Sequence, residues 1–294
     1  MSYRPEYKWS IKGIDLKSKT QDEIDGLFQK ALEEGIHGLC YSAYEEGQKP
    51  GSILTEAQIR KRMAIIAPYT KWIRTFSCIE GNELIPVIAK EYGLKTMVGA
   101  WLGDDKELIE EELEGLLKLA KGGYVDIAAV GNEVLYRNDL TEDELLEYIE
   151  RVKIALPDIP VGYVDAYYEF SVHPRITDAC DVILANCYPY WESCHVDYSL
   201  MHAKQMYYQA LAAGKGKKVI ITETGWPSQG TPLDDAAPSR ANAVRYFLNM
   251  QKWSAEENIE MFYFTSFDES WKVGAEGDVG AYWGLWDNEE KLKF

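Results

Sequence analysis

Two glutamates occupy positions where an apolar run of the sequence turns abruptly polar. Glu133 closes the run IAAVGNE, and Glu223 closes the run KVIITE. An ionised carboxylate in such surroundings costs free energy unless a partner stabilises it. Two facing carboxyls suit the cleavage of a glycosidic bond, because one protonates the leaving oxygen and the other attacks the anomeric carbon or activates water. A single such glutamate is more often a salt-bridge partner, but two of them favour a catalytic pair.

Eight short runs rich in β-branched or aromatic residues recur along the chain and predict strands. They are Ile36–Tyr41, Trp72–Ser77, Lys95–Trp101, Ile127–Glu133, Val161–Ala166, Val182–Tyr188, Lys218–Glu223 and Met261–Phe267. Apolar residues at helical spacing predict helices at Thr20–Glu34 and Lys106–Ala120. A capping box formed by Thr141 and Glu144 predicts a helix at Thr141–Ala155, and Ser239–Lys252 is a further helical candidate. Eight strands that alternate with helices predict an α/β fold, a single (β/α)8 TIM barrel that forms one catalytic domain of residues 1–294.

The carboxyl ends of barrel strands are where the chemistry of such a fold is found. The fourth predicted strand ends in Gly131–Glu133, the seventh runs into Thr224–Pro227, and the eighth is followed by Asp268–Lys272. An open, doubly wound sheet is the alternative fold, but it would usually carry a glycine-rich phosphate loop after its first strand. The first strand here is followed by Ser42–Tyr44 instead. We therefore expect the polar residues after strands four, seven and eight to meet at one mouth.

Composition limits the partners of the chain. A formal net charge of -17 disfavours nucleic acid and anionic membranes, whereas an uncharged sugar meets no such repulsion. No segment has the roughly 20 consecutive apolar residues that cross a membrane. The N-terminus shows no apolar leader, so we expect a cytoplasmic protein, or a secreted or periplasmic one if a signal peptide was removed. We expect a monomer.

The cysteines indicate neither a disulfide framework nor a metal site. There are five of them, an odd number without tight spacing, and buried free thiols are the expected state. Cys187, Cys194 and His195 lie close in sequence, but their spacing matches no standard zinc pattern. We therefore expect no metal and no cofactor.

Two of these segments resemble the catalytic signatures of a known family. VGNEVL at residues 130–135 and ITETGWPSQG at residues 221–230 are similar to those of glycoside hydrolase family 17, the β-1,3-glucanases and β-1,3-glucanosyltransferases. Further segments agree in order: GLCYSAY, IRTFSC, ANCYPY, FDESWK and YWGLW. The resemblance extends from about Gly38 to Trp286, and it is closest to the microbial branch of the family.

The resemblance implies a retaining mechanism and a set of roles. Glu133 would be the acid/base, Glu223 the nucleophile, and Asn132 would hold the sugar 2-hydroxyl. Glu269 and Lys272 would form hydrogen bonds at the reacting subsite. The plant members carry a further glutamate shortly before the Trp-Gly-Leu segment. That stretch reads Gly-Ala-Tyr here and the nearest glutamate stands several residues earlier, so this role is not assigned.

Other residues at the strand ends have both a binding and a structural interpretation. Tyr41 either lines the reacting subsite or fills the top layer of the core. Arg74 lies within a strand and needs a carboxylate partner, which could be Glu133 or Glu223. The aromatic candidates for contact with the flat faces of a sugar are Tyr188, Tyr190, Trp191, Trp226 and Trp283.

The sequence thus predicts a retaining hydrolase that cleaves β-1,3-glucan, with an oligo- or polysaccharide as its partner. Glucanosyl transfer shares the first step and the covalent intermediate, and remains open. A non-catalytic glucan-binding barrel is a second alternative, which predicts the loss of one carboxylate. A third is an aldolase with Lys272 as a Schiff-base lysine.

Overall fold

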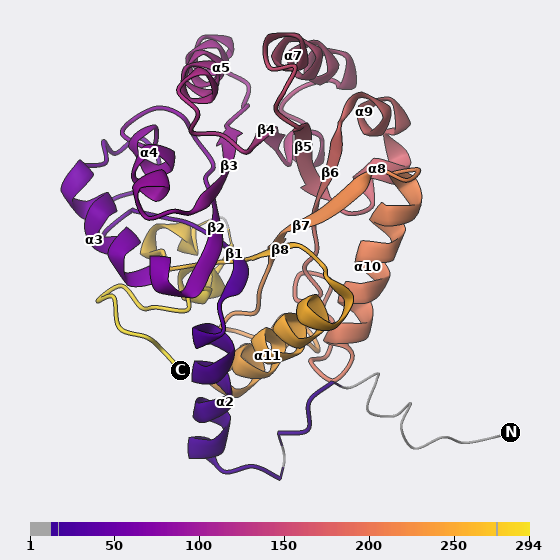
Figure 1. Cartoon of the computed structure of the whole chain (residues 1–294). Coiled ribbons are helices and arrows are strands. Elements are labelled where there is room, and N and C mark those ends of the chain that lie inside the picture. Colours follow the sequence, from indigo (N-terminus) through magenta and orange to yellow (C-terminus); the bar gives the residue numbers. More distant parts are fainter. Residues whose placement is uncertain (1–12, 17, 275) are drawn as a thin grey trace, which may run out of the picture.

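The computed structural model describes residues 13–16, 18–274 and 276–294. Eight parallel strands form a closed barrel in which each strand pairs with the next in sequence and β8 pairs with β1 (Figure 1). The strands are β1 Ile36–Cys40, β2 Thr70–Arg74, β3 Lys95–Ala100, β4 Ile127–Asn132, β5 Val161–Ala166, β6 Val182–Asn186, β7 Lys218–Thr224 and β8 Met261–Tyr263. The (β/α)8 barrel predicted from the sequence is confirmed.

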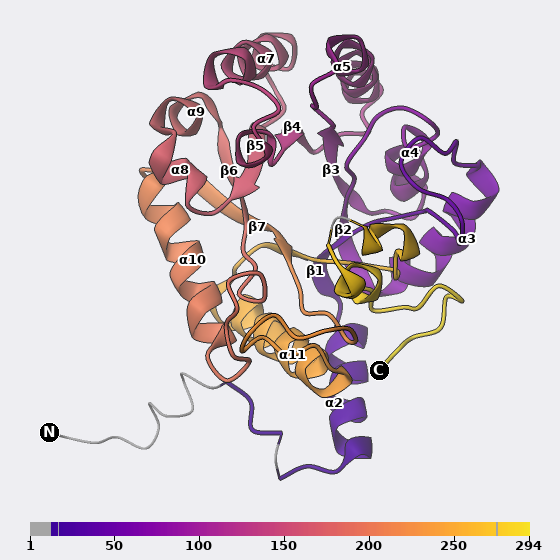
Figure 2. The same ribbon diagram turned by 180° about the vertical axis from the view of Figure 1, so that it is seen from behind.

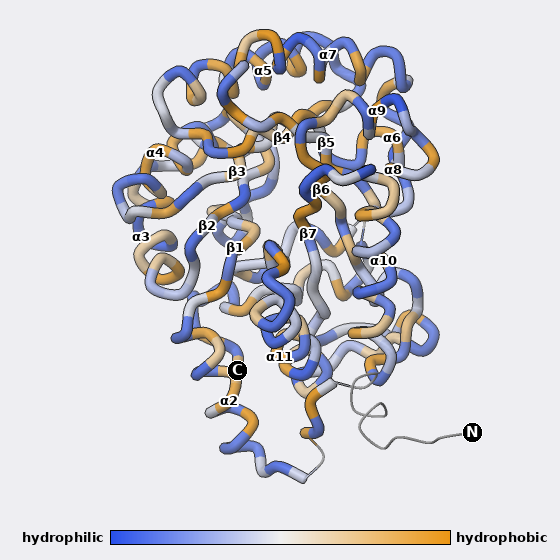
Figure 3. Tube along the Cα trace, turned by 45° about the vertical axis from the view of Figure 1, so that its right-hand side comes forward, coloured by the Kyte–Doolittle hydropathy of each residue, from blue (hydrophilic) through white to orange (hydrophobic). Residues whose placement is uncertain are grey.

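Helices surround the barrel on its outside (Figures 1 and 2). They are α2 Gln21–Glu33, α3 Glu56–Ile66, α4 Leu84–Glu91, α5 Lys106–Lys121, α6 Val134–Arg137, α7 Glu142–Ala155, α8 Glu169–Val172, α9 Pro174–Ala179, α10 Ser199–Ala213 and α11 Arg240–Glu257. Short 3-10 helices η1 Ala67–Tyr69, η2 Ser270–Val273 and η3 Asp278–Tyr282 complete the elements. Hydropathy alternates along these helices because one face of each packs on the barrel and the other meets solvent (Figure 3).

Side-chain caps fix where several helices begin. Thr20, Thr55 and Thr141 each accept a hydrogen bond from the backbone of the first helical turn, and the third residue of each helix returns a hydrogen bond to the cap. The box predicted at Thr141 is therefore confirmed. The last helix is longer than predicted, because α11 continues beyond Lys252 and buries Trp253 against the barrel.

Several strands end earlier than the sequence indicates. The sixth ends at Asn186 rather than Tyr188, and the eighth ends at Tyr263 rather than Phe267. The pairing register also shifts near the carboxyl ends, at Ala185/Asn186 between β6 and β7 and at Ala129/Asn132 between β4 and β5. Such irregularities re-aim side chains. The apolar runs continue past the sheet because their last residues turn inward to build the mouth of the barrel.

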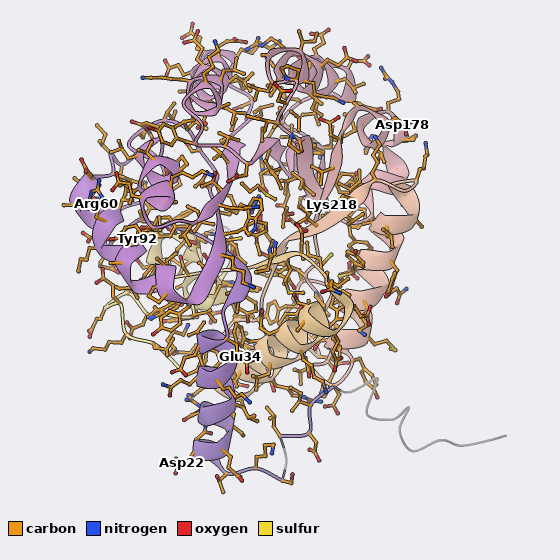
Figure 4. The ribbon with its side chains drawn as sticks, in the orientation of Figure 1. Asp22, Glu34, Arg60, Tyr92, Asp178 and Lys218 are labelled. Atoms are coloured by element: carbon orange, nitrogen blue, oxygen red, sulfur yellow. The ribbon has the colours of Figure 1, made fainter. Side chains whose placement is uncertain are left out.

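Charged side chains gather on the outer surface. In Figure 4, Arg60 on α3 and Asp178 on α9 extend from the outer rim of the helices on different sides of the molecule. Arg60 pairs with Glu91 at 2.6 Å. No helix within the described residues has the length and apolar character needed to span a membrane. Four of the five cysteines are buried free thiols, as predicted, whereas Cys194 is a half-buried free thiol.

The last residues of the chain fasten the segment after β8. Lys293 Nζ contacts Asp268 Oδ1 at 2.7 Å, and both side chains are buried. Asp268 Oδ1 also accepts the backbone N–H of Gly284. The ring of Phe294 packs on Phe28 of α2, with centroids 5.2 Å apart. The last two residues therefore connect α2 with the segment after β8, and the contact with Asp268 lies next to Glu269 of the predicted site.

Replacing Lys293 with methionine is expected to destabilise the fold by about 3 kcal/mol or more, because Asp268 would remain buried without its cation. Denaturant unfolding of the two proteins measures the difference. Lys291→Met is the matched control, since Lys291 pairs with Glu289 while both side chains are exposed. Equal losses in the two variants would contradict a special role for the buried pair.

Candidate active site

A cleft of about 1110 Å³ opens at the carboxyl ends of the strands. Both predicted catalytic carboxyls, Glu133 and Glu223, lie on its wall. Aromatic side chains make up much of the remaining surface: Tyr44, Phe76, Trp101, Tyr136, Tyr167, Tyr168, Tyr188, Trp191, Phe264, Trp271 and Trp283. An apolar, aromatic cleft with a few converging polar groups is the usual form of a ligand site.

Glu133 stands at the junction of β4 and the short helix α6. Its backbone is left-handed, with φ 52° and ψ 32°, and its N–H donates to the carbonyl oxygen of Val164 at 2.7 Å. The helix that follows is held from below: the Leu135 N–H donates to the Tyr163 hydroxyl, which in turn donates to Asp165. A strained conformation that the surroundings enforce is common at functional sites. These contacts fix the direction in which the Glu133 carboxyl points.

The protonation of Glu133 suits an acid at neutral pH. Burial is the largest cause and raises the pKa of Glu133 to about 7, and the nearby charge of Glu223 acts in the same direction. The hydrogen bond from Asn186 opposes this rise. A carboxylic acid with a pKa near the working pH is the property that general acid catalysis requires.

Glu223 accepts hydrogen bonds from several donors. Its Oε1 accepts from Arg74 Nη1 at 2.6 Å, and its Oε2 accepts from the Tyr188 hydroxyl at 2.8 Å. Burial alone would lower the pKa of Arg74, but the Glu223 carboxylate outweighs it and the pKa is raised. Arg74 is the paired cation that the sequence required, and Glu223 is its partner. These contacts orient the carboxyl group in the wall of the cleft.

One nitrogen atom lies between the two carboxyls. Asn186 Nδ2 donates to Glu133 Oε1 at 2.8 Å and to Glu223 Oε1 at 3.3 Å. The two oxygens cannot be farther apart than these distances combined, which is less than the roughly 6.5 Å at which inverting enzymes begin. The geometry therefore favours direct attack by one carboxyl over activation of a water between them.

Asn132 joins this network through Arg74. Its Oδ1 accepts from Arg74 Nη2 at 2.7 Å, so the guanidinium bridges Asn132 and Glu223. The guanidinium also lies over the ring of Phe76, 4.2 Å from the centroid. Because Arg74 occupies the Asn132 oxygen, the amide nitrogen of Asn132 is the group left to meet a ligand hydroxyl. The structure thus brings Asn132 to the same side of the cleft as Glu223.

Lys272 lies in an acidic pocket at the other side of Glu223. Its Nζ contacts Glu269 Oε2 at 3.2 Å and Glu276 Oε1 at 3.7 Å, over the ring of Phe264. Burial would lower the pKa of Lys272, but Glu269 and Glu276 outweigh it and the pKa is raised. A Schiff-base lysine needs a lowered pKa to be a neutral nucleophile. The environment of Lys272 therefore disfavours the aldolase alternative.

The aromatic candidates separate into two groups. Tyr188, Trp191 and Trp283 line the cleft, and Trp191 is 39% exposed. Tyr190 and Trp226 are buried beneath them, and the Trp226 indole N–H donates to the Ala237 carbonyl. The prediction that these two rings contact a sugar is wrong for this structure, because Trp191 and Trp283 pack above Tyr190. Tyr190 therefore supports Trp191 and Trp283, the rings that line the cleft, and Trp226 in turn packs on Tyr190.

Tyr41 serves the core more than the cleft. It is 2% exposed, and its hydroxyl donates to the carbonyl oxygen of Ile59 at 2.9 Å. Only part of its side chain reaches the cleft wall. Of the two interpretations open for Tyr41, the structure favours the core.

The structure brings to the site three polar residues to which the sequence assigned no role. Asn186 contacts both carboxyls, Glu276 contacts Lys272, and Glu112 lines the cleft while its carboxylate accepts from Ser77 Oγ at 2.5 Å. Asn186 ends β6, but the predicted strand continued to Tyr188, so the strand-end rule that identified Glu133 did not mark it. Glu112 lies on α5 in a run of acidic residues that reads as a solvated helix face, so nothing local marked it.

The pKa values of three buried carboxyls, Glu112, Glu133 and Asp165, indicate how the stability of the fold depends on pH. Burial raises the pKa of Glu112 and of Glu133 to about 7 and that of Asp165 to about 6. The folded state therefore binds the protons of these carboxyls more tightly than the unfolded chain does. The stability that this proton binding adds to the fold is complete below about pH 4, and it is lost as the pH rises to about 7. The free energy of unfolding is expected to be lower at pH 8 than at pH 5.

Glu112→Gln tests this expectation, because glutamine keeps an acceptor for the Ser77 hydroxyl and cannot ionise. The variant should lose part of the difference in unfolding free energy between pH 5 and pH 8, on the order of a kcal/mol or more. Denaturant titrations at both values measure it. If the difference in unfolding free energy between pH 5 and pH 8 were unchanged in the variant, Glu112 would not be a buried carboxyl with a raised pKa.

Among the described residues, no group of three or more His, Cys, Asp or Glu is arranged to hold a metal ion. The site instead consists of carboxyls, amides and hydroxyls with Lys272, Arg74 and Arg137, among aromatic rings. Both carboxyls predicted to be catalytic are present, which disfavours the alternative of a non-catalytic binding barrel.

The mouth of this closed parallel barrel holds two carboxyls, one with a raised pKa and one bound by an arginine. This arrangement is typical of a glycoside hydrolase. Comparison with known proteins gives the family. The model of the BtgE/BtgC glycoside hydrolase domain matches residues 38–284. The chain therefore belongs to glycoside hydrolase family 17, and the resemblance seen in the sequence is confirmed.

Individual relatives agree. A glucan 1,3-beta-glucosidase of Candida albicans is 30% identical over 77% of this chain and 82% of its own length. The glucan 1,3-beta-glucosidase of Saccharomyces cerevisiae is 27% identical over 83% and 86%. Among solved structures, the family 17 β-1,3-glucanosyltransferase of Rhizomucor miehei is 28% identical, with a TM-score of 0.79 over 89% of this chain and 96% of that one.

Proposed function

We propose that this chain is a retaining enzyme that cleaves β-1,3-linked glucan, with Glu133 as acid/base and Glu223 as nucleophile. The observation that carries the proposal is the single Asn186 nitrogen that reaches both carboxyls. The linkage is supported by the relatives, which are named for 1,3-β-glucan. The acidic chain, at -17, suits a neutral polysaccharide.

The first step uses the two carboxyls together. Glu133 gives its proton to the glycosidic oxygen as that oxygen leaves with the bonding electron pair, and Glu223 forms a bond to the anomeric carbon. Glu133 is then a carboxylate and takes a proton from the incoming acceptor, which breaks the bond to Glu223 and restores both groups. Asn132, Glu269 and Lys272 are placed to hold the sugar hydroxyls around the reacting carbon.

The second candidate, glucanosyl transfer, differs only in the acceptor, which is a sugar hydroxyl instead of water. It is supported by the Rhizomucor miehei neighbour, a glucanosyltransferase that matches nearly the whole chain. The aromatic cleft supports it as well, because Trp101 and Tyr136 are 39% and 57% exposed near Glu133 and offer surfaces for an acceptor sugar.

One experiment addresses both candidates. The protein is incubated with laminari-oligosaccharides of defined length, and the products are separated by size and their anomers identified at early times. Shorter products with the β configuration support retaining hydrolysis, and longer products support transfer. Absence of any product, together with an unchanged result for Glu223→Ala, would contradict the proposal. We further propose that residues 1–294 act as one catalytic domain and as a monomer.

A further inference from the structure

Asn186 is the last residue of β6 and is 3% exposed. The register shift between β6 and β7 sets it directly opposite Glu223 in the sheet. Without that shift, a different residue of β7 would stand beside it. The amide is therefore placed by the backbone of the barrel, not by a mobile loop.

A second residue fixes which way the amide faces. The Thr222 hydroxyl donates to Asn186 Oδ1 at 2.8 Å, and this leaves Nδ2 toward the carboxyls. The reverse orientation would point the amide oxygen at two carboxyl oxygens, one of them ionised, and would leave both without this donor. Thr222 is fully buried, so water cannot replace its hydroxyl.

The two hydrogens of Nδ2 then serve two different groups, Glu133 Oε1 at 2.8 Å and Glu223 Oε1 at 3.3 Å. We propose that Asn186 is a positioning residue that sets the separation of the two catalytic carboxyls and keeps a hydrogen bond to each while the negative charge moves from one to the other. This inference rests on the proposed function.

The charge transfer explains why one amide is sufficient. Before reaction Glu223 is the carboxylate and Glu133 carries the proton; after the first step Glu223 is an ester and Glu133 is the carboxylate. The pair holds one negative charge throughout, so a fixed donor between them stabilises both states without moving. Such preorganised donors contribute strongly to catalysis because they need no reorganisation during the step.

The test compares Asn186→Ala with the wild-type protein on laminari-oligosaccharides. We expect kcat to fall about 100-fold with KM changed little, because the loss concerns the reacting groups rather than binding. The hydrogen bond from Asn186 lowers the pKa of Glu133. Its removal should therefore move the alkaline limb of the pH profile upward, by roughly one pH unit.

An activated substrate separates the effects on the two carboxyls. The dinitrophenolate of a dinitrophenyl glucoside leaves without a proton, so formation of the glycosyl-enzyme on this substrate does not need Glu133 as acid. The rate of that first step in Asn186→Ala, measured as the initial release of dinitrophenolate, should remain well below wild type, because the nucleophile is also misplaced. Full recovery would overturn the claim that Asn186 serves both groups. Thr222→Val, which removes only the hydroxyl that orients the amide, should shift the alkaline limb in the same direction by a smaller amount.

Asn249→Ala is the matched control. Asn249 is 1% exposed on α11 and accepts a hydrogen bond from the Ile14 N–H, outside the residues that line the cleft. Its replacement should lower the melting temperature and leave the pH profile unchanged. If Asn186→Ala behaves like this control, Asn186 is merely structural and the inference fails. If the wild-type protein acts on no glucan, the proposed function fails instead.

Discussion

Glu223→Gln is expected to lower kcat on β-1,3-glucan by on the order of 10⁵-fold, because loss of a covalent nucleophile removes the whole two-step route. Glutamine keeps the size of the side chain and an acceptor for the Tyr188 hydroxyl, which bonds Glu223 at 2.8 Å. Initial rates with laminari-oligosaccharides measure the loss. Glu192→Gln is the control, since Glu192 also lines the cleft but pairs with His202.

A variant with a smaller side chain, Glu223→Ala, shows from which face of the sugar the anomeric carbon is attacked. In Glu223→Ala, added azide can occupy the vacated space and attack the anomeric carbon once, while Glu133 still protonates the leaving oxygen. The expected product is a glucosyl azide of inverted, α configuration. A β-glucosyl azide, or a loss no greater than that of Glu192→Gln, would contradict the assignment of Glu223 as nucleophile.

Glu133→Ala is expected to lower kcat/KM on glucan by about 10²–10⁴-fold, which is the usual contribution of a general acid or base. Because burial raises the pKa of Glu133 to about 7, wild-type activity should fall as the pH rises through that value and the acid loses its proton. The variant should lack this alkaline limb. Profiles of kcat/KM between pH 4 and pH 9 measure both effects.

Leaving-group chemistry provides the control for this variant. With a dinitrophenyl glucoside the first step needs no acid, so Glu133→Ala should form the glycosyl-enzyme at nearly the wild-type rate and then stall. Added azide should release it as a β-glucosyl azide. Equal losses on glucan and on the activated substrate would show that Glu133 does not act as the acid.

The fold could be predicted from the sequence because buried parallel strands appear as apolar runs, and eight such strands are the number that closes a (β/α)8 barrel. The same rule located Glu133 and Glu223, since polar residues that follow such runs lie at the carboxyl ends. The strand limits were less accessible. The residues after β6 and β8 are as apolar as the strands themselves, and only the three-dimensional register shows that they leave the sheet.

The details of the site depended on contacts between distant residues. The partner of Arg74 was open between two glutamates, and 149 residues separate it from the one it binds. Tyr190 and Trp226 were expected at the cleft because they follow strand ends, but both are buried, Tyr190 against Trp191 and Trp283, and Trp226 against Tyr190 and Tyr246. A strand-end position predicts proximity to the mouth, and it does not tell which ring of a stack is outermost.

The Arg74–Glu223 contact also bears on whether this barrel could be divided. Arg74 comes from β2 and Glu223 from β7, so the ion pair joins the first half of the polypeptide to the second. A fragment that ends after β4 would carry a guanidinium designed for burial, with no carboxylate to neutralise it, and an unpaired buried charge is strongly destabilising. Recombining halves from different barrels would therefore succeed only where the incoming half supplies a matching partner for the charge in the half that is kept, so this ion pair restricts the modular assembly of the fold.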